Sequence, residues 1–377
     1  MDVICYSHLR WNFVYQRPQH LMSRFAKHFR VFFVEEPVFD TEKGFLDNTL
    51  STEGVWVIVP HLPDGLNETA IHELTENLLH EFFNYFHVKE YLFWYYTPMA
   101  LPITQSFQPA LVVYDCMDEL SAFKNAPPTM KIMEEELMEK ADLVFTGGQS
   151  LYEAKRELHP CIFPFPSSID KKHFGKTRTI LLDPIDQFSI PHPRIGFFGV
   201  VDERMDMGLL DMIARRKPKW NFIIIGPIVK IDPQILPVHP NIYYLGARQY
   251  EDLPNYLAGW DVAMMPFAIN ESTRYISPTK TLEYLAGGKP IVSTAILDVV
   301  IPYGEKGLVY IARNPEEFIR GVEEELSLED RERWQKAVDA FLAETSWDTT
   351  VEKMLYLINT KLESKQHNII QKEDEYV

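Results

Sequence analysis

The chain has 377 residues, which predicts two or three compact domains at roughly 150 residues per domain. Its 46% hydrophobic and 24% charged residues are typical of an ordered globular protein and exclude long disorder and fibrous repeats. The formal net charge of −17 repels polyanions at long range, so we expect no nucleic acid among the partners.

Cysteine usage and the N-terminus indicate the compartment. Cys5, Cys116 and Cys161 are far apart and lie in apolar runs, which predicts free thiols in a reducing environment. The N-terminus lacks the features of a signal peptide, and no segment approaches the roughly 18 apolar residues of a transmembrane helix. We therefore expect a cytoplasmic protein. The aromatic stretch at 90–103 is either a buried strand or a surface for a lipid-linked acceptor, which leaves peripheral association with the inner face of the membrane open.

Short β-branched and aromatic runs alternate with segments of helical period, which predicts parallel strands joined by helices. The first half is expected to form strands at 2–7, 30–36, 55–60, 91–96, 110–115 and 142–147, and helices at 17–28, 71–86 and 130–140. Prolines then gather and the period is lost, which predicts a linker. The second half is expected to form strands at 194–199, 221–227, 241–246, 261–266, 289–294 and 307–312, and a last helix from 346 to about 363.

Two successive α/β halves predict two Rossmann-like, doubly wound domains facing each other across a cleft. We place the N-terminal domain at 1–170, the linker at 171–193, the C-terminal domain at 194–345 and a terminal helix at 346–377. Open α/β sheets bind ligands beyond the carboxyl ends of their strands. The cleft is therefore the expected site.

The segment SPTKTLEYLAGGKPIVST at 277–294 predicts a helix whose first turn binds an anion. Pro278 suits the first helical position, so Thr279 and Lys280 fall in the first turn. Free backbone N–H groups and the helix dipole attract a phosphate there, and Lys280 adds a full charge. Glu283 lies on the same face, where it can accept hydrogen bonds from sugar hydroxyls. The alternative is a capped helix with a surface Lys–Glu pair.

Candidates on the N-terminal side follow two predicted strands. Arg17 and His20 are three residues apart at a helix start and can project together, although a packed histidine is the alternative. Asp115 and Asp118 follow the strand at 110–115, where a carboxylate could orient or deprotonate an acceptor hydroxyl. This spacing offers no cluster for a divalent metal, so we expect neither a metal nor another cofactor.

The 277–294 segment resembles the nucleotide-sugar signature of GT-B glycosyltransferases, in the GT4-like group also called glycosyltransferase family 1. The second half shows further stretches similar to this group, in the expected order: RIGFFGVVDERMD (194–206), NIYYLGARQYEDLPNYLAGWDVAMMPF (241–267) and SWD (346–348). The first half resembles a subgroup related to teichuronic acid and exopolysaccharide transferases: WNFVYQRPQHLMSRFAKH (11–28), YDCMDELSAF (114–123) and PSSIDKKHF (166–174).

This resemblance implies a GT-B fold with a C-terminal helix that crosses back to the N-terminal domain. It implies sugar transfer, with retention of configuration and without metal, from a nucleoside diphosphate sugar such as a UDP-sugar to a carbohydrate or lipid-linked acceptor in cell-surface polysaccharide synthesis. The donor roles it implies are diphosphate binding by Arg204, Lys280, Thr279 and Pro278, ribose binding by Glu283, and base binding by Gly246, Arg248 and Tyr250.

The expected catalytic residues are Asp118, His20 and Glu271, and Arg17 and Asp115 are the further candidates on the acceptor side. Glu271 departs from the family pattern, because it stands twelve residues before Glu283 in E-x11-E, where typical members carry E-x7-E. This departure keeps a second hypothesis open, a non-catalytic nucleotide-sugar-binding partner of an active transferase. A Rossmann oxidoreductase is disfavoured, since no G-x-G-x-x-G follows the first strand of either half.

Overall fold

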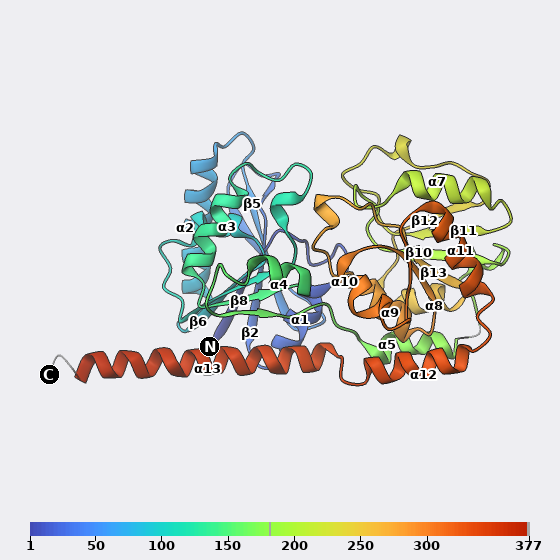
Figure 1. The fold of residues 1–377 in the computed structure, drawn as a ribbon. Helices are drawn as coiled ribbons and strands as arrows, with labels where there is room; N and C mark the ends of the chain where they lie inside the picture. Colours follow the sequence, from blue (N-terminus) through green and yellow to red (C-terminus); the bar gives the residue numbers. More distant parts are fainter. Residues whose placement is uncertain (181, 375–377) are drawn as a thin grey trace.

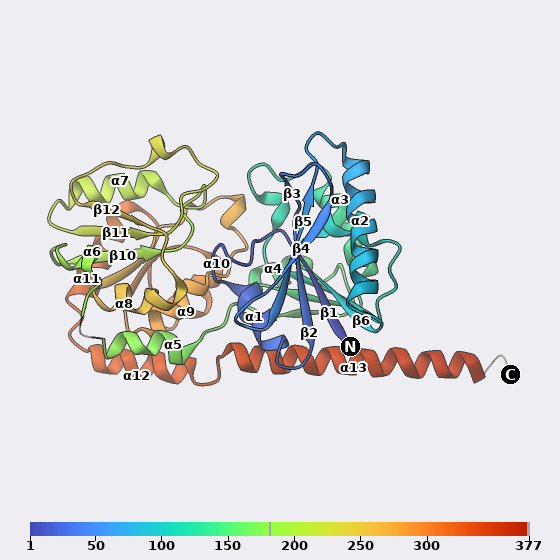
Figure 2. The same cartoon turned by 180° about the vertical axis from the view of Figure 1, so that it is seen from behind.

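The computed structural model describes residues 1–180 and 182–374. The chain forms two α/β units that lie side by side, and helix α13 (Trp347–Asp374) runs beneath the first unit (Figures 1 and 2). The two α/β domains expected from the sequence are present, with one sheet in each unit.

The first unit contains a nine-stranded sheet of order β3-β5-β2-β1-β6-β7-β8-β9, in which β4 pairs with β5. Its strands are β1 (Asp2–Ser7), β2 (Arg30–Glu35), β3 (Val38–Phe39), β4 (Phe45–Leu50), β5 (Val55–Leu62), β6 (Tyr91–Tyr95), β7 (Leu111–Cys116), β8 (Leu143–Thr146) and β9 (Ile162–Pro164). Its helices are α1 (Arg17–Phe25), α2 (Glu68–Tyr85), α3 (Met130–Lys140) and α4 (Gln149–Lys155). All six expected strands are present. Strands β3, β4 and β9 were not predicted, because none of them carries a buried apolar run of its own.

The second unit contains a six-stranded parallel sheet of order β12-β11-β10-β13-β14-β15. Its strands are β10 (Arg194–Phe198), β11 (Asn221–Ile225), β12 (Ile242–Gly246), β13 (Val262–Met265), β14 (Ile291–Thr294) and β15 (Tyr310–Ala312). Its helices are α7 (Met207–Arg216), α8 (Leu253–Ala258), α9 (Thr279–Ala286), α10 (Leu297–Val299), α11 (Pro315–Leu326) and α12 (Arg331–Leu342). All six strands match the expected ones within three residues at either end.

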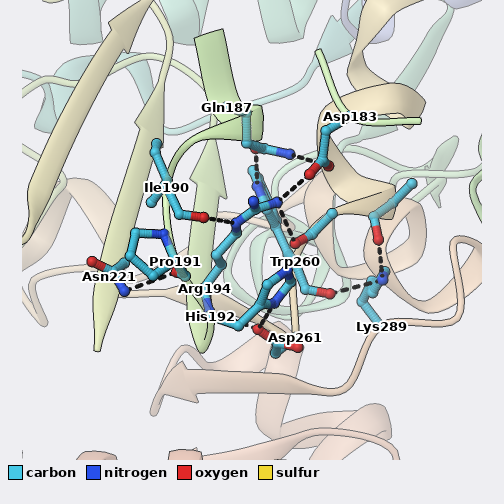
Figure 3. A network of polar contacts seen from close by, with 12 residues as sticks. Asp183, Gln187, Ile190, Pro191, His192, Arg194, Asn221, Trp260, Asp261 and Lys289 are labelled. Carbon is cyan, nitrogen blue, oxygen red and sulfur yellow. Dashed lines mark hydrogen bonds and ion pairs between the residues drawn. The ribbon is translucent and has the colours of Figure 1, made fainter. Parts of the chain in front are cut away.

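The segment expected to be a linker is ordered against the second unit. It contains α5 (Lys171–Gly175) and α6 (Ile185–Phe188). Arg194, at the buried start of β10, donates to the Ile190 carbonyl at 2.7 Å and pairs with Asp183 at 2.6 Å, while Trp260 Nε1 donates to Gln187 Oε1 at 2.9 Å (Figure 3). These contacts attach the second half of the segment to the amino ends of the two central strands of the second sheet, β10 and β13.

Helix α13 returns to the first unit, as the resemblance implied. Trp347, Val351, Met354 and Ile358 recur on one face and pack into the core of the first unit. The helix continues to Asp374, so its expected end near 363 is wrong, and 375–377 lie outside the described residues.

Candidate functional site

A cavity of about 1050 Å³ separates the two sheets. The first unit lines it with the loop 10–16 after β1 and with the hairpin around 47–53. The second unit lines it with the loops after β10, β11 and β12 and with the first turns of α9. Ligand-sized clefts at the carboxyl ends of parallel strands are the usual binding sites of such sheets. The site therefore lies in the cleft that the sequence predicted.

The start of α9 opens on this cavity. Pro278 is the N-cap and Thr279 the first helical residue, so the helix begins one residue later than expected. Thr279, Lys280 and Glu283 line the cavity, whereas Pro278 is not among the lining residues. A side-chain carbon at Gly199, where φ is +142°, would lie 2.0 Å from Lys280 Cε, so this glycine provides the space that the lysine occupies.

Lys280 and Glu283 are an unpaired cation and carboxylate. Neither side chain forms an ion pair within the part of the chain that the structure describes. Burial lowers the pKa of Lys280, and nearby Arg204 lowers it further, although Glu283 opposes them. Glu283 is 6% exposed, and burial raises its pKa to about 7 against the opposing charge of Lys280. Both groups keep hydrogen-bonding capacity for a ligand.

Arg204 lies in the loop after β10 and lines the same cavity. The Asp202 carboxylate accepts three hydrogen bonds from its guanidinium, one from Nη2 at 2.7 Å and two from Nε at 3.0 and 3.1 Å. Its guanidinium also lies 5.6 Å from the ring centroid of Phe123, in the first unit. Arg204 therefore lines the cleft, but the Asp202 carboxylate offsets part of its charge, whereas Lys280 has no ion-pair partner in the described chain.

The residues expected to bind the base have other partners. Arg248 lines the cavity, but it contacts the Asp186 carboxylate and donates to Tyr256 Oη at 2.6 Å. Gly246 ends β12 with φ +75° and is not among the lining residues.

Both faces of the Tyr250 ring are covered. Tyr15 stacks on it with a centroid distance of 4.5 Å, and His173 stacks on it at 4.3 Å. Tyr250 lines the cavity, but its ring is already stacked by protein side chains, so the expectation that it packs on a base is wrong. The tyrosine joins the first unit to the segment before the second sheet.

Glu271 does not face the cavity. It lies in the loop after β13, its side chain is 79% exposed, and its carboxylate is 3.7 Å from Arg274. The prediction that it lies near a donor sugar is wrong for this conformation, because the longer spacing in E-x11-E forms a loop that turns toward solvent.

Arg17 and Asp115 form a buried ion pair and do not line the cavity. Arg17 Nη2 lies 2.8 Å from Asp115 Oδ1, Nη1 donates to the Phe165 carbonyl, and their exposed fractions are 3% and 0%. Burial raises the pKa of Asp115 while Arg17 lowers it. Their predicted place on the acceptor side is wrong, since the pair connects α1 to β7 inside the first unit.

His20 is also part of the interior. Its ring stacks on Trp347 at 4.7 Å and it is 2% exposed. Burial holds the pKa of His20 well below its usual value of 6.5, so the ring is neutral at physiological pH. The packed-histidine alternative is confirmed and the catalytic prediction for His20 is wrong.

Asp118 is the predicted N-terminal carboxylate whose charge interacts with the cations of the second unit. Burial raises its pKa to about 6, and the nearby charges of Arg204 and Arg17, and more weakly Lys280, oppose that rise. It is not among the lining residues of the cavity, but it lies near the boundary between the two units.

Sequence reasoning missed the β4–β5 hairpin. Its register places Asp47 opposite Val59 and Thr49 opposite Val57, and all four residues line the cavity. The Gly54 turn was the only local signal, because β4 is polar and exposed along most of its length.

Two further features concern metals and membranes. Among residues 1–180 and 182–374, no group of three or more His, Cys, Asp and Glu side chains is arranged to hold a metal ion. Within the same residues, no helix combines the length and the apolar composition that a membrane crossing requires.

Comparison with known proteins supports the resemblance. Residues 192–327 match the family described as "Glycosyl transferases group 1". A stretch of 103 residues is 30% identical to the "Putative teichuronic acid biosynthesis glycosyltransferase TuaH" of Bacillus subtilis (strain 168). That match covers 26% of this chain and 26% of the relative, so the chain matches about a quarter of the relative's length.

Two solved structures share the fold over almost the whole chain. Sucrose-phosphate synthase from Thermosynechococcus elongatus has a TM-score of 0.72 and 14% identity, over 96% of this chain and 99% of that one. Anabaena Alr3699/HepE, in complex with UDP-glucose, has a TM-score of 0.69 and 14% identity, over 96% and 100%. The GT-B fold class is confirmed, and the chain resembles group 1 glycosyltransferases of the teichuronic acid type.

Proposed function

We propose that this protein is a glycosyltransferase that moves a sugar from a nucleoside diphosphate sugar to a carbohydrate or lipid-linked acceptor. The observation that carries the proposal is the pair Lys280 and Glu283, which projects from the first turns of α9 into the cavity without an ion-pair partner in the described chain. A cation at a helix N-terminus beside a carboxylate suits a diphosphate next to a ribose.

The donor is proposed to lie along the wall formed by the second unit. Its diphosphate contacts Lys280, Arg204 and the backbone amides that begin α9, and its ribose hydroxyls donate to Glu283. The base lies along 247–251, where backbone groups read its edge and Arg248 borders it. UDP is the nucleotide we propose, supported by the UDP-glucose complex of the similar Anabaena protein.

The catalysis we propose is electrostatic. When the bond between the anomeric carbon and the phosphate oxygen lengthens, negative charge grows on the diphosphate. Lys280 and the α9 N-terminus are held in place before the reaction, so they stabilise this charge without reorganising. These protein cations supply the charge that the leaving group needs, so the proposal includes no metal ion and no other cofactor. The resemblance to group 1 supports retention of configuration.

Asp118 is the proposed group on the acceptor side. A carboxylate whose burial raises its pKa to about 6 can accept a proton from a hydroxyl group at neutral pH. A place in cell-surface polysaccharide synthesis is the wider role we propose, supported by the name of the Bacillus relative.

The second candidate function is a nucleotide-sugar-binding protein without transferase activity. One observation favours it, because Glu271 faces solvent and leaves no predicted carboxylate beside the donor sugar.

Nucleotide release from a panel of UDP-, GDP- and TDP-sugars, measured with and without glycoside acceptors, separates the two functions. We expect release by the wild-type protein and a loss of about 10- to 100-fold in Lys280→Ala, since a charge-assisted hydrogen bond contributes about 1.5–3 kcal/mol. The control is Lys336→Ala, which removes an exposed lysine of α12 outside the cavity. Donor binding without release under any condition would support the binding protein instead.

A further inference from the structure

The two walls of the cavity differ in charge. The wall from the second unit carries Lys280 and Arg204. On the wall from the first unit, the one cation among the described lining residues is Arg10, which pairs with Glu35 at 2.9 Å and donates to the Glu36 carbonyl. That wall therefore offers no free cation among the residues that the structure describes.

The same wall carries two carboxylates, Asp47 and Glu53, on the β4–β5 hairpin. Neither forms an ion pair or a side-chain hydrogen bond within residues 1–180 and 182–374. Every second residue of a strand points to the same face of the sheet, so Asp47 and Thr49 face the cavity together. The hairpin turns a polar, negatively charged edge toward any ligand opposite the donor.

Apolar side chains and hydroxyl groups complete this wall. Phe13 is 47% exposed and Leu50 is 53% exposed, and both line the cavity beside Thr49 and Ser51. Exposed aromatic and aliphatic side chains pack on the C–H face of a sugar ring, while hydroxyl and carboxylate oxygens bind its hydroxyls. The opposite wall marks the cavity as a ligand site, since Glu283, the proposed ribose ligand, is 6% exposed, lines the cavity and has no ion-pair partner in the described chain.

We infer that the face of the β4–β5 hairpin, together with Phe13, is an acceptor subsite selective for an uncharged sugar ring. The inference rests on the proposed function and narrows its acceptor. A carboxylate or phosphate on that ring would meet Asp47 and Glu53 with no free cation on the same wall to offset them, in a chain whose net charge is already −17. The sugar unit of the acceptor that receives the transferred sugar is thus neutral, even where other sugar units of the acceptor are charged.

The experiment compares methyl glucoside with methyl glucuronide, which differ in one carboxylate. Binding of each is measured by NMR titration in the presence of UDP, with wild-type protein, with Asp47→Asn/Glu53→Gln, and with the control Glu135→Gln/Glu139→Gln. The control removes two exposed carboxylates of α3 that do not line the cavity, so the change in net charge is the same.

We expect wild type and control to bind the glucoside at least ten-fold more tightly than the glucuronide, and the hairpin variant to reduce this ratio to less than three-fold. Equal or preferred binding of the glucuronide by wild type, an unchanged ratio in the hairpin variant, or no binding of either glycoside would each overturn the inference. A parallel calorimetric titration with UDP distinguishes failure of this inference from failure of the proposed function. If UDP binds and glycoside selectivity is absent, the inference alone fails. If UDP does not bind, the proposed function fails.

Discussion

At the scale of single residues, the free or paired state of a charge decides what it can do. Lys280 and Glu283 have no ion-pair partner in the described chain, so they can bind a ligand in the cavity. Arg17 and Asp115 instead form an ion pair with each other in the core. A buried charge left without partners costs several kcal/mol, so a fold keeps one where a ligand compensates it. This contrast is the physical basis for placing the donor at α9.

Glu283→Gln should stabilise the protein at alkaline pH. Burial raises the pKa of Glu283 from its usual value of 4.5 to about 7 in the folded state, so the unfolded chain ionises first and stability falls as pH rises from about 4.5 to 7. The variant avoids this loss, which amounts to at most about 3 kcal/mol.

Melting temperatures at pH 4.5 and pH 8 check this prediction. The variant and wild type should melt together at pH 4.5, and the variant should melt several degrees higher at pH 8. A variant that is no more stable than wild type at pH 8 would show that Glu283 is not an uncompensated buried carboxylate.

Removing one partner of the Arg17–Asp115 pair should be strongly destabilising. Asp115→Ala leaves a 3% exposed guanidinium without its carboxylate, which we expect to cost about 3–5 kcal/mol. Urea unfolding followed by circular dichroism measures this cost. Arg17→Met/Asp115→Leu, which removes both charges, should recover most of it. An Asp115→Ala variant with the same free energy of unfolding as wild type would contradict a structural role for the pair.

Residue patterns predicted Lys280, Glu283 and Asp118 near the cleft because each follows a recognisable strand or helix start. The same patterns gave the wrong roles for Arg17, His20 and Tyr250. The partners of these three residues, Asp115, Trp347 and Tyr15, lie far away in the chain and become neighbours only in the fold.

At the scale of elements, the helices and strands with buried faces were predictable and the polar ones were not. Helix α3 begins and ends at the expected residues, and every expected strand is present. Strand β4 escaped prediction because its residues face solvent or the cavity. The acceptor subsite thus depends on the element with the weakest sequence signal.

Helix α13 should stabilise the first unit through one face only. Met354→Ala, at a position that is 0% exposed, should cost about 2–5 kcal/mol, because it leaves a cavity in the core. Tyr356→Ala is the matched control on the same helix, since Tyr356 is 71% exposed. Thermal unfolding of both variants measures the difference, and equal losses would contradict the packing of α13 described above.

At the scale of the whole molecule, the alternation of strands and helices was enough to predict two sheets. How the units meet was not predictable, because it depends on contacts such as Arg204 over Phe123 and Tyr15 on Tyr250. The net charge of −17 acts at this scale too, since it disfavours long-range attraction of an anionic donor. Donor binding must therefore depend on the few local cations of one wall.

The central claim is that a nucleoside diphosphate binds at the start of α9. Isothermal titration calorimetry with UDP, for wild type, Lys280→Ala and the control Lys336→Ala, tests it most directly. The account predicts binding by wild type and Lys336→Ala, and affinity about 10- to 100-fold weaker in Lys280→Ala, with circular dichroism showing that each protein is folded. Equal affinity in all three proteins, or no UDP binding by wild type, would contradict it.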